Sequence, residues 1–395
     1  MSKNITFDVI VAGGSVSGLL CAREIARSGL SVVVLEEDSE IGTPEHCGGL
    51  VSLKAMEKLG ILPSSRSILH NINKAQLLSH SKDFELRVQS DKLVVMDRRE
   101  FDKQLAFQTQ KFGAYIFTKT LVMSINYDSI DRRFKIKTNN GLFFSNFFVD
   151  ARGISSLIKT QNRSGILQSA QYEIYADWIS SDSIIVKFDS EKYPQFFAWV
   201  IPIAKGKAKI GVAGSKINTI QTLDSFISTF GSKYSTIRKI YAPIWVGGPL
   251  KNFVNEFSLV VGDAAGQTKP TTAGGIFSCG MGGVLAGKSI SEFKKTNDKE
   301  DLNQYQKKWY SIFGKEFQQM LFFRKILERL DNKSLDEIFS LVSNIDLNEI
   351  SKSASFDFHS MAISRLLGTK KTMRLLSTML GNEIRHILPN RSPYT

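Results

Sequence analysis

Glycine, serine and acidic residues near the N-terminus have the spacing that binds a dinucleotide. The sequence DVIVAGGSVSG, from Asp8 to Gly18, runs from an apolar strand into a tight turn. Gly13 allows that turn, and the helix that follows offers free N–H groups and a positive dipole end to a pyrophosphate. Ser15 replaces the middle glycine of the usual G-x-G-x-x-G pattern, and its small side chain still lets a phosphate approach. The candidate cofactor-binding residues here are Gly13, Gly14, Ser15, Ser17 and Gly18.

An acidic residue completes this unit at the end of the second apolar run. Leu30 to Leu35 is predicted to be a strand, and Glu36 and Glu37 follow it. A carboxylate at this place accepts hydrogen bonds from a ribose, and we choose Glu36 for that role. Strand, glycine turn, helix and acid together favour a βαβ dinucleotide-binding unit over an ordinary strand-to-helix turn.

A second acid lies far along the chain, in the sequence GDAAGQTKPTTAGGI. Asp263 follows a short predicted strand, Leu259 to Val261, and precedes several glycines. A carboxylate after a strand end, with glycines behind it, suits the binding of hydroxyls and phosphates at a helix N-terminus. The alternative is an aspartate that only caps the helix. The candidates in this segment are Gly262, Asp263, Gly274, Gly275 and Ile276.

Two loop residues have side chains that take part in redox and proton chemistry. Cys47 and His46 lie in HCGGL, within an irregular segment from Ile41 to Leu50. His46 is a candidate proton donor because an imidazole titrates near neutral pH. The competing interpretations are a small buried thiol and a surface histidine. Five histidines and three cysteines are scattered without metal-ligand spacing, so no metal site is expected.

Aromatic residues are concentrated on one predicted strand. Phe196, Phe197 and Trp199 lie between Pro194 and Pro202, the prolines that fix the strand ends. Such a cluster is either ordinary core or the wall of an apolar tunnel. The predicted substrate-binding residues are Phe196, Phe197, Trp199 and Pro202.

Composition limits the compartment and the partners. The 395 residues are 42% hydrophobic, enough for a sizeable core, and three cysteines are too few for a disulfide scaffold. No signal peptide or long uncharged apolar run is recognised, so a cytoplasmic chain that does not cross a bilayer is expected. The net charge of +13 favours an acidic partner. Because no basic motif of a nucleic-acid module is present, no nucleic acid is expected, which leaves a solvated surface or an anionic membrane face.

The predicted elements give the chain a discontinuous organisation. Strands at 121–127, 134–138 and 142–149 return to the first sheet, while 171–214 favours a separate antiparallel sheet. Small-residue spacing predicts a helix over 276–294, and helical periodicity continues from Asp301. The fold class is α/β. The predicted domains are a cofactor-binding domain (1–70, 95–165 and 250–295), a substrate-binding antiparallel sheet (71–94 and 166–249) and a C-terminal helical region (296–395).

Several motifs, in this order, resemble one family. The glycine turn, the sequence RREFD from Arg98 and the GDAAG segment are typical of monooxygenase-like FAD flavoproteins. PQFFAWVIP, from Pro194, resembles a motif of the geranylgeranyl reductase family, which includes digeranylgeranylglycerophospholipid reductases. Phe197 and Ile201 replace the Tyr and Phe of that motif, so a pocket wall fits better than a role for a phenol hydroxyl. The resemblance implies a Rossmann-type FAD-binding domain of the aromatic-hydroxylase-like flavoprotein fold.

The resemblance also implies roles for particular residues. Asp263 would bind the ribityl chain of FAD, Arg98 the ribityl or phosphate region, and the backbone of Val122 the adenine. For Arg98 the alternative is a surface salt bridge. Cys47 and Gly48 would lie near the flavin and the substrate, and pairing of Cys47 with Cys279 is left open. Lys269 is a candidate for holding a lipid phosphate.

The implied activity is reduction of C=C bonds in isoprenoid lipid chains by hydride from reduced FAD. The electron donor is left open between NADPH and an electron-donor protein such as ferredoxin, because no second nucleotide fingerprint in the sequence identifies it. Peripheral attachment to the inner face of the cell membrane is expected from the charge. The alternatives are an FAD-dependent monooxygenase and a basic, membrane-associated electron-transfer flavoprotein.

Overall fold

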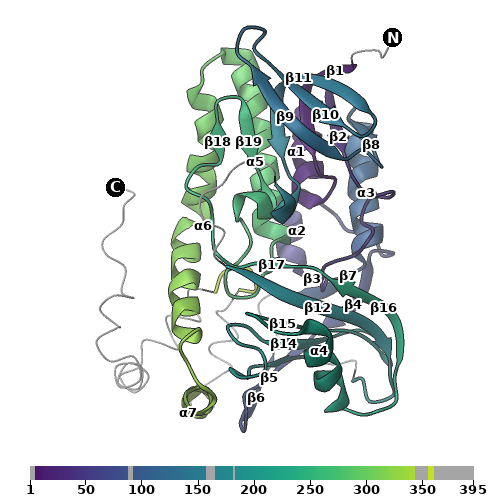
Figure 1. Cartoon of the computed structure of the whole chain (residues 1–395), viewed down its shortest axis with the longest axis vertical. Helices are drawn as coiled ribbons and strands as arrows, with labels where there is room; N and C mark the ends of the chain where they lie inside the picture. Colours follow the sequence, from purple (N-terminus) through teal and green to yellow (C-terminus); the bar gives the residue numbers. More distant parts are fainter. Residues whose placement is uncertain (1–4, 88–91, 157–164, 181–182, 343–354, 360–395) are drawn as a thin grey trace.

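The computed structural model describes residues 5–87, 92–156, 165–180, 183–342 and 355–359. Two large sheets occupy the two halves of the molecule, and the long helices α5 and α6 run beside the first of them (Figure 1). A small third sheet, β3-β7-β4, lies between the halves. Its strands are β3 (Leu50–Ser52), β4 (Ile68–Ile72) and β7 (Leu93–Met96).

The first sheet is parallel at its centre, in the order β18-β19-β11-β1-β2-β8, and only β18 in this row is antiparallel. An antiparallel pair, β9 and β10, extends from β11. The central strands are buried apolar runs, as expected for strands covered on both faces. The bounds are β1 (Ile5–Ala12), β2 (Val32–Leu35), β8 (Tyr115–Phe117), β9 (Val122–Asp128), β10 (Arg133–Thr138), β11 (Gly141–Asp150), β18 (Val254–Asn255) and β19 (Ser258–Val260).

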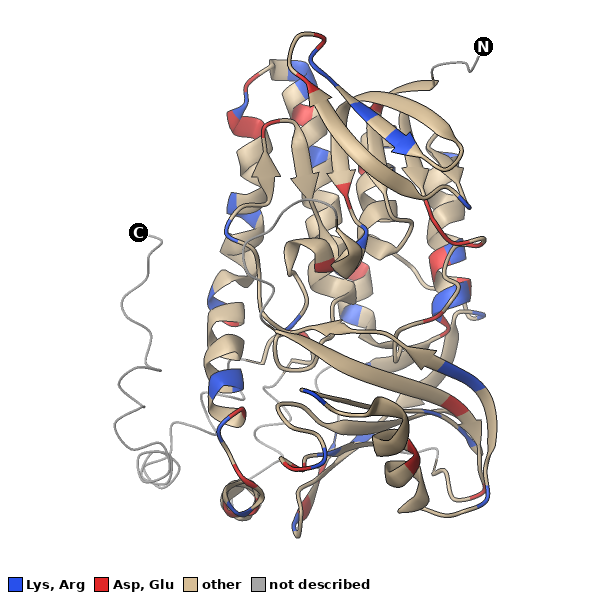
Figure 2. Ribbon diagram, viewed as in Figure 1, with Lys and Arg blue, Asp and Glu red and all other residues tan. Residues whose placement is uncertain are grey.

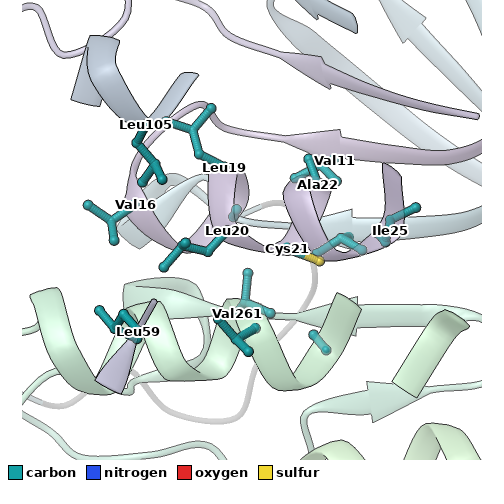
Figure 3. Close-up of a cluster of buried hydrophobic side chains, with 14 of the residues drawn as sticks. Val11, Val16, Leu19, Leu20, Cys21, Ala22, Ile25, Leu59, Leu105 and Val261 are labelled. Carbon is teal, nitrogen blue, oxygen red and sulfur yellow. The ribbon is translucent and has the colours of Figure 1, made fainter. Parts of the chain in front are cut away.

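Helices α1 (Val16–Arg27) and α5 (Ile276–Thr296) are in close contact over this sheet, and α3 (Arg98–Lys111) packs against α1. Figure 3 shows Leu19, Leu20 and Cys21 of α1 in the buried cluster that also contains Val261. Glycines allow the two backbones to approach, since a Cβ on Gly283 would lie 2.1 Å from the Ser17 carbonyl oxygen. The predicted helix over 276–294 corresponds to α5.

The second sheet has the order β16-β12-β15-β14-β13-β5-β6, and β17 pairs with the other end of β12. It is antiparallel except for the β13–β5 pair. Helix α4 (Thr219–Ser228) covers one face with Leu223, Phe226 and Ile227. The bounds are β5 (Lys74–Leu78), β6 (Asp83–Arg87), β12 (Ile166–Tyr175), β13 (Ser183–Lys187), β14 (Ala198–Ala204), β15 (Lys207–Gly214), β16 (Ser235–Tyr241) and β17 (Ile244–Trp245).

The C-terminal part begins with two helices, α6 (Glu300–Leu327) and α7 (Asn332–Val342). Trp309, Phe313 and Phe317 form the buried face of α6. A short segment, 355–359, lies against α5 and α6 through Phe358. The rest of the predicted helical region, 343–354 and 360–395, lies outside the described residues.

Charged residues of both signs are spread over both halves of the ribbon (Figure 2). Within the part of the chain that the structure describes, no helix is long and apolar enough to cross a membrane. The same described residues contain no group of three or more His, Cys, Asp or Glu side chains placed to hold a metal ion.

Candidate functional site

The glycine turn after β1 is shaped by backbone contacts that leave no room for side chains. Gly13 has φ +108°, and a Cβ there would lie 2.4 Å from the Ala151 carbonyl oxygen. A Cβ on Gly18 would lie 2.0 Å from the Gly13 carbonyl oxygen. Ser15 is exposed and occupies the N-cap position of α1 without a side-chain cap bond. The first N–H groups of α1 are therefore not capped by that serine, and they suit an anion.

Glu36 reaches back from the end of β2 to this turn. Its Oε2 accepts a hydrogen bond of 2.6 Å from the Gly14 backbone N–H, and Oε1 accepts one of 2.9 Å from Asp38 N–H. Glu36 is half-buried whereas Glu37 is exposed. Burial raises the pKa of Glu36. The carboxylate thus lies beside the glycine turn, where a ribose hydroxyl would meet it.

Val122, the predicted adenine contact, is buried at the start of β9. Its segment joins the Glu36 region through a hydrogen bond of 2.8 Å from Thr120 N–H to the Glu36 carbonyl oxygen. The structure therefore brings the Val122 segment beside the acid at the end of β2, and its contact with adenine remains a prediction.

Arg98 connects the start of α3 with the start of α1. Its guanidinium makes a bidentate ion pair with Asp102, at 2.9 and 2.7 Å, and also donates to Ser15 Oγ at 3.3 Å. Burial lowers the pKa of Arg98, but the Asp102 carboxylate and the Cys47 sulfur outweigh it, so the net pKa is raised. Arg98 is a fixed positive charge beside the glycine turn, and its side chain is 11% exposed.

Gly262 and Asp263 place the GDAAG segment against the start of α1. Gly262 has φ +71°, and a Cβ there would lie 2.5 Å from Ser17 Oγ of α1. The exposed Asp263 accepts hydrogen bonds from Thr268 Oγ1 and, at 3.4 Å, from Cys279 Sγ. Asp263 is not the cap of α5, because Gly275 holds that position without a side-chain bond.

The two glycines before α5 also lie at this junction. A Cβ on Gly275 would lie 2.8 Å from Cys279 Sγ and 3.4 Å from Asp263 Oδ1. Gly274 lies against Lys269 instead, where a Cβ would be 3.0 Å from Cε. The N-termini of α1, α3 and α5 therefore converge on one set of glycine-rich turns.

A pocket extends from these turns to the Cys47 loop. Cys47 is half-buried and accepts a hydrogen bond of 3.3 Å at its sulfur from Gly49 N–H. Gly48 faces the second sheet, and a Cβ on it would lie 2.7 Å from Ile201 Cδ1. Cys47, Cys21 and Cys279 are free thiols. The pocket is lined by Cys47, Leu50, Val51, Ala55, Met56, Lys269, Gly274, Gly275, Ile276, Phe277, Ser278, Phe356 and Asp357.

An ion pair that sequence reasoning missed holds the Cys47 loop in place. Glu45 and Lys209 are buried, with Nζ and Oε1 at 2.5 Å, and Arg238 approaches the same carboxylate at 3.3 Å. Lys209 also donates to the Cys47 carbonyl oxygen at 3.4 Å, and Glu45 accepts from Arg98 N–H at 3.0 Å. The sequence signal that could have revealed this ion pair is a lysine within the apolar run of β15.

The aromatic residues gather on the second sheet. Phe196 and Phe197 stack at 4.1 Å between centroids, and Trp199 meets Phe197 edge-on at 6.2 Å. Trp199 Nε1 donates to Gln171 Oε1 at 3.1 Å. Pro202 is buried on the opposite face of β14, because side chains alternate along a strand. The structure thus groups three of the predicted substrate residues and separates Pro202 from them.

The two remaining polar candidates, His46 and Lys269, differ in their surroundings. His46 is exposed and does not line the pocket. Lys269 is buried, and its Nζ donates to the Phe356 carbonyl oxygen at 2.8 Å, so it is not displayed at a surface for a lipid phosphate. Phe356 and Asp357 were not identified from the sequence because they follow no recognisable motif.

Comparisons with known proteins cover nearly the whole chain, although no protein-family model matches it. Digeranylgeranylglycerophospholipid reductase 2 of Methanothermobacter thermautotrophicus is 29% identical over 374 residues, which cover 88% of this chain and 94% of the relative. Digeranylgeranylglycerophospholipid reductase 1 of Methanopyrus kandleri is 28% identical over 370 residues, with 86% and 96% covered.

Solved structures show the same fold. A geranylgeranyl bacteriochlorophyll reductase-like protein from Thermoplasma acidophilum superposes with a TM-score of 0.84 at 23% identity, covering 96% of this chain and 100% of that one. A flavin-dependent brominase superposes with a TM-score of 0.67 at 15% identity, covering 92% and 98%. The predicted α/β flavoprotein fold is thereby confirmed. Together with this fold, the full-length similarity to named digeranylgeranylglycerophospholipid reductases supports the geranylgeranyl reductase family of FAD-dependent oxidoreductases for this chain.

Proposed function

We propose that this chain uses FAD to saturate C=C bonds in the geranylgeranyl chains of lipid precursors. Full-length similarity to digeranylgeranylglycerophospholipid reductases supports this activity. The observation that carries it is one continuous pocket wall, in which the glycines before α5 and the Cys47 loop meet Phe356. Phe356 in turn packs in the cluster that contains Trp199 and Ile201. The proposed cofactor site and an apolar face are therefore adjacent.

The turns fit a dinucleotide because they carry no side chains where the phosphates must come close to the backbone. At Gly13 and Gly18 a Cβ has no room, and the uncapped starts of α1 and α5 supply N–H groups for phosphates. Glu36 would accept hydrogen bonds from the ribose, and Asp263 from the ribityl hydroxyls. The cationic Arg98 would favour the phosphates. When bound, reduced FAD would supply the hydride.

The apolar face would hold the isoprenoid chain. Trp199, Ile201 and Ile203 alternate on one side of β14, toward the third sheet and Phe356. Trp199 is fixed by its hydrogen bond to Gln171, so its ring keeps one orientation. A rigid aromatic wall positions a flexible chain and excludes water, both of which favour hydride transfer over side reactions.

The test is anaerobic. The FAD-loaded protein is reduced with dithionite and mixed with a geranylgeranyl glycerophospholipid or geranylgeranyl diphosphate, while absorbance follows flavin reoxidation. Mass spectrometry measures gains of two hydrogens per double bond. Reoxidation with saturated product supports the reductase. Product that gains oxygen only after O₂ is admitted indicates a monooxygenase, and reoxidation only by a redox protein indicates an electron-transfer flavoprotein.

A further inference from the structure

Lys269 is a buried amine in the wall of the proposed cofactor pocket. Its side chain is 5% exposed, and its Nζ donates a hydrogen bond of 2.8 Å to the Phe356 carbonyl oxygen. Asp357 Oδ1 is 3.7 Å from the same nitrogen, and the Phe356 ring centroid is 4.2 Å away. An ammonium offers three N–H donors. The Phe356 carbonyl oxygen accepts a hydrogen bond from it and the Asp357 carboxylate pairs with it, which partly compensates for burying the charge.

The local backbone holds this amine over the start of α5. Lys269 N–H donates to the Gly274 carbonyl oxygen at 3.0 Å, and Ala273 N–H donates to the Lys269 carbonyl oxygen at 2.9 Å. A Cβ on Gly274 would lie 3.5 Å from Lys269 Nζ. The lysine thus shares a pocket wall with Gly274 and Gly275, two of the candidate cofactor-binding residues.

The other titratable groups nearby are poorer proton donors. His359 has both ring nitrogens engaged, with Thr271 Oγ1 at 2.8 Å and the Phe356 carbonyl oxygen at 2.9 Å. Burial, reinforced by the charge of Lys269, lowers the pKa of His359 to about 3, so the imidazole is neutral at pH 7. A carboxylate at Asp357, beside an ammonium, accepts protons rather than donating them.

The Ser278 hydroxyl of this wall already donates to the Gln267 carbonyl oxygen at 2.6 Å. Among the side chains of the described pocket wall that can lose a proton near neutral pH, the Cys47 thiol and the Lys269 ammonium therefore remain. Burial lowers the pKa of Lys269, although the carboxylates of Asp357 and Glu316 oppose the shift. A lower pKa makes the ammonium a stronger acid, which favours it as a general acid near neutral pH.

We propose that the Lys269 ammonium donates the proton that completes saturation of the substrate double bond. This inference rests on the proposed function. One alkene carbon accepts the hydride from the reduced cofactor, and the other accepts the proton from Nζ. The π bond breaks, two C–H bonds form, the cofactor loses two electrons, and Lys269 is left as a neutral amine. Water then returns a proton to the amine, and the Asp357 carboxylate stabilises the restored ammonium.

Single-turnover reoxidation of reduced, FAD-loaded enzyme by geranylgeranyl diphosphate or the glycerophospholipid tests the role. Wild-type turnover must come first, since its failure contradicts the proposed function and not this step alone. Lys269→Met and Lys269→Arg are both expected to slow reoxidation by about 100-fold or more, the range of a lost general acid. Arginine keeps the charge but does not release its proton. Recovery of the wild-type rate by arginine would mean that only charge is needed, and would overturn the proposal.

Binding measurements separate chemistry from structure. The dissociation constants of FAD and of substrate with oxidised enzyme should change less than about threefold in both variants. The reason is that the proposed proton transfer occurs after both molecules have bound. Lys295→Met is the matched control, since that side chain is 66% exposed, and it should leave every rate unchanged. A Cys47→Ser variant that abolishes reoxidation while Lys269→Met preserves it would assign the proton to the thiol and reject Lys269.

The Asp357→Asn variant tests the same role independently, because it leaves Lys269 in place and changes only its neighbour. The groups that bear on Lys269 are Asp357, Glu316 of α6 and the neutral His359. Removing the Asp357 carboxylate lowers the pKa of the amine, so the alkaline midpoint of the reoxidation rate should move to lower pH by about half a unit or more. A midpoint that does not move contradicts the proposal, even where the Lys269 variants fail to bind FAD.

Discussion

At Glu36 one carboxylate joins the end of β2 to the glycine turn. It accepts hydrogen bonds from Gly14 N–H at 2.6 Å and from Asp38 N–H at 2.9 Å. Both bonds fix the side chain before any ligand arrives, so little rotamer entropy is lost when a ribose binds. The exposed neighbour Glu37 has no such fixation in the hydrogen bonds of the described residues. Position and preorganisation, rather than charge, distinguish the two acids.

Glu36→Gln should weaken FAD binding about tenfold or more, because a charged acceptor of the ribose hydroxyls is lost. Titration of cofactor-free protein by flavin fluorescence measures the dissociation constant. Glu37→Gln is the matched control and should change it less than twofold. Equal losses in the two variants would show that the local negative charge matters and not the Glu36 contact.

We also expect FAD affinity to depend on pH through Glu36. Burial raises the pKa of Glu36 above its ordinary value. As the pH falls, Glu36 therefore becomes protonated earlier than an exposed glutamate, and FAD affinity should begin to fall at a higher pH. In Glu36→Gln this part of the pH dependence should disappear.

At the scale of elements, the site depends on how closely α1 and α5 approach. Gly283 and Gly287 of α5 face the Ser17 and Cys21 carbonyl oxygens of α1, at 2.1 and 2.6 Å from where a Cβ would be. Both helix starts border the glycine turns, so a shift of one helix moves the proposed phosphate site. Close packing transmits such a displacement because interiors leave few voids.

Gly283→Ala should destabilise the fold by about 1–3 kcal/mol and weaken FAD binding, because its Cβ meets backbone and not a movable side chain. Gly314→Ala, also in the middle of a helix, is the control, since its nearest neighbour is the Tyr310 ring at 3.2 Å. The control should lie within about 1 kcal/mol of wild type. Urea unfolding measures both, and equal stabilities would contradict the packing argument.

The buried Glu45–Lys209 pair ties β15 to the Cys47 loop. Lys209→Met leaves the Glu45 carboxylate without its nearest cation in a site where both side chains are 3% exposed, so a loss of about 3–5 kcal/mol is expected. The double variant with Glu45→Gln should lose less than the sum of the single variants. Glu292→Gln, in an exposed pair with Lys295, should cost under about 1 kcal/mol. Additive losses would mean that the pair is not coupled.

Local patterns predicted elements better than their long-range contacts. The Phe- and Val-rich run at 142–149 and the small-residue run from 276 correspond to β11 and α5, because periodicity is a property of neighbouring residues. The parallel pairing of β5 with β13 joins segments about a hundred residues apart, and no local signal encodes it. For the same reason the Glu45–Lys209 pair and the placement of Phe356 and Asp357 beside Lys269 were not foreseen.

At the scale of the whole molecule, the net charge and the proposed lipid substrate both favour contact with a membrane surface. The chain has 51 basic and 38 acidic residues, a net charge of +13. In Figure 2 the charges of the described residues are dispersed over both halves, so many separate side chains contribute to the attraction to an anionic surface. A substrate with long isoprenoid chains is expected to reside in a bilayer. We propose that the excess positive charge brings the enzyme to that surface.

The protein should therefore sediment with vesicles that contain anionic lipid at low ionic strength and be released as salt is added. Screening explains the release, because the Debye length falls from about 10 Å at 0.1 M salt to about 3 Å at 1 M. Vesicles of zwitterionic lipid alone are the control and should retain much less protein. Binding to both vesicle types that resists salt would mean that apolar insertion, and not the net charge, holds the enzyme at the membrane.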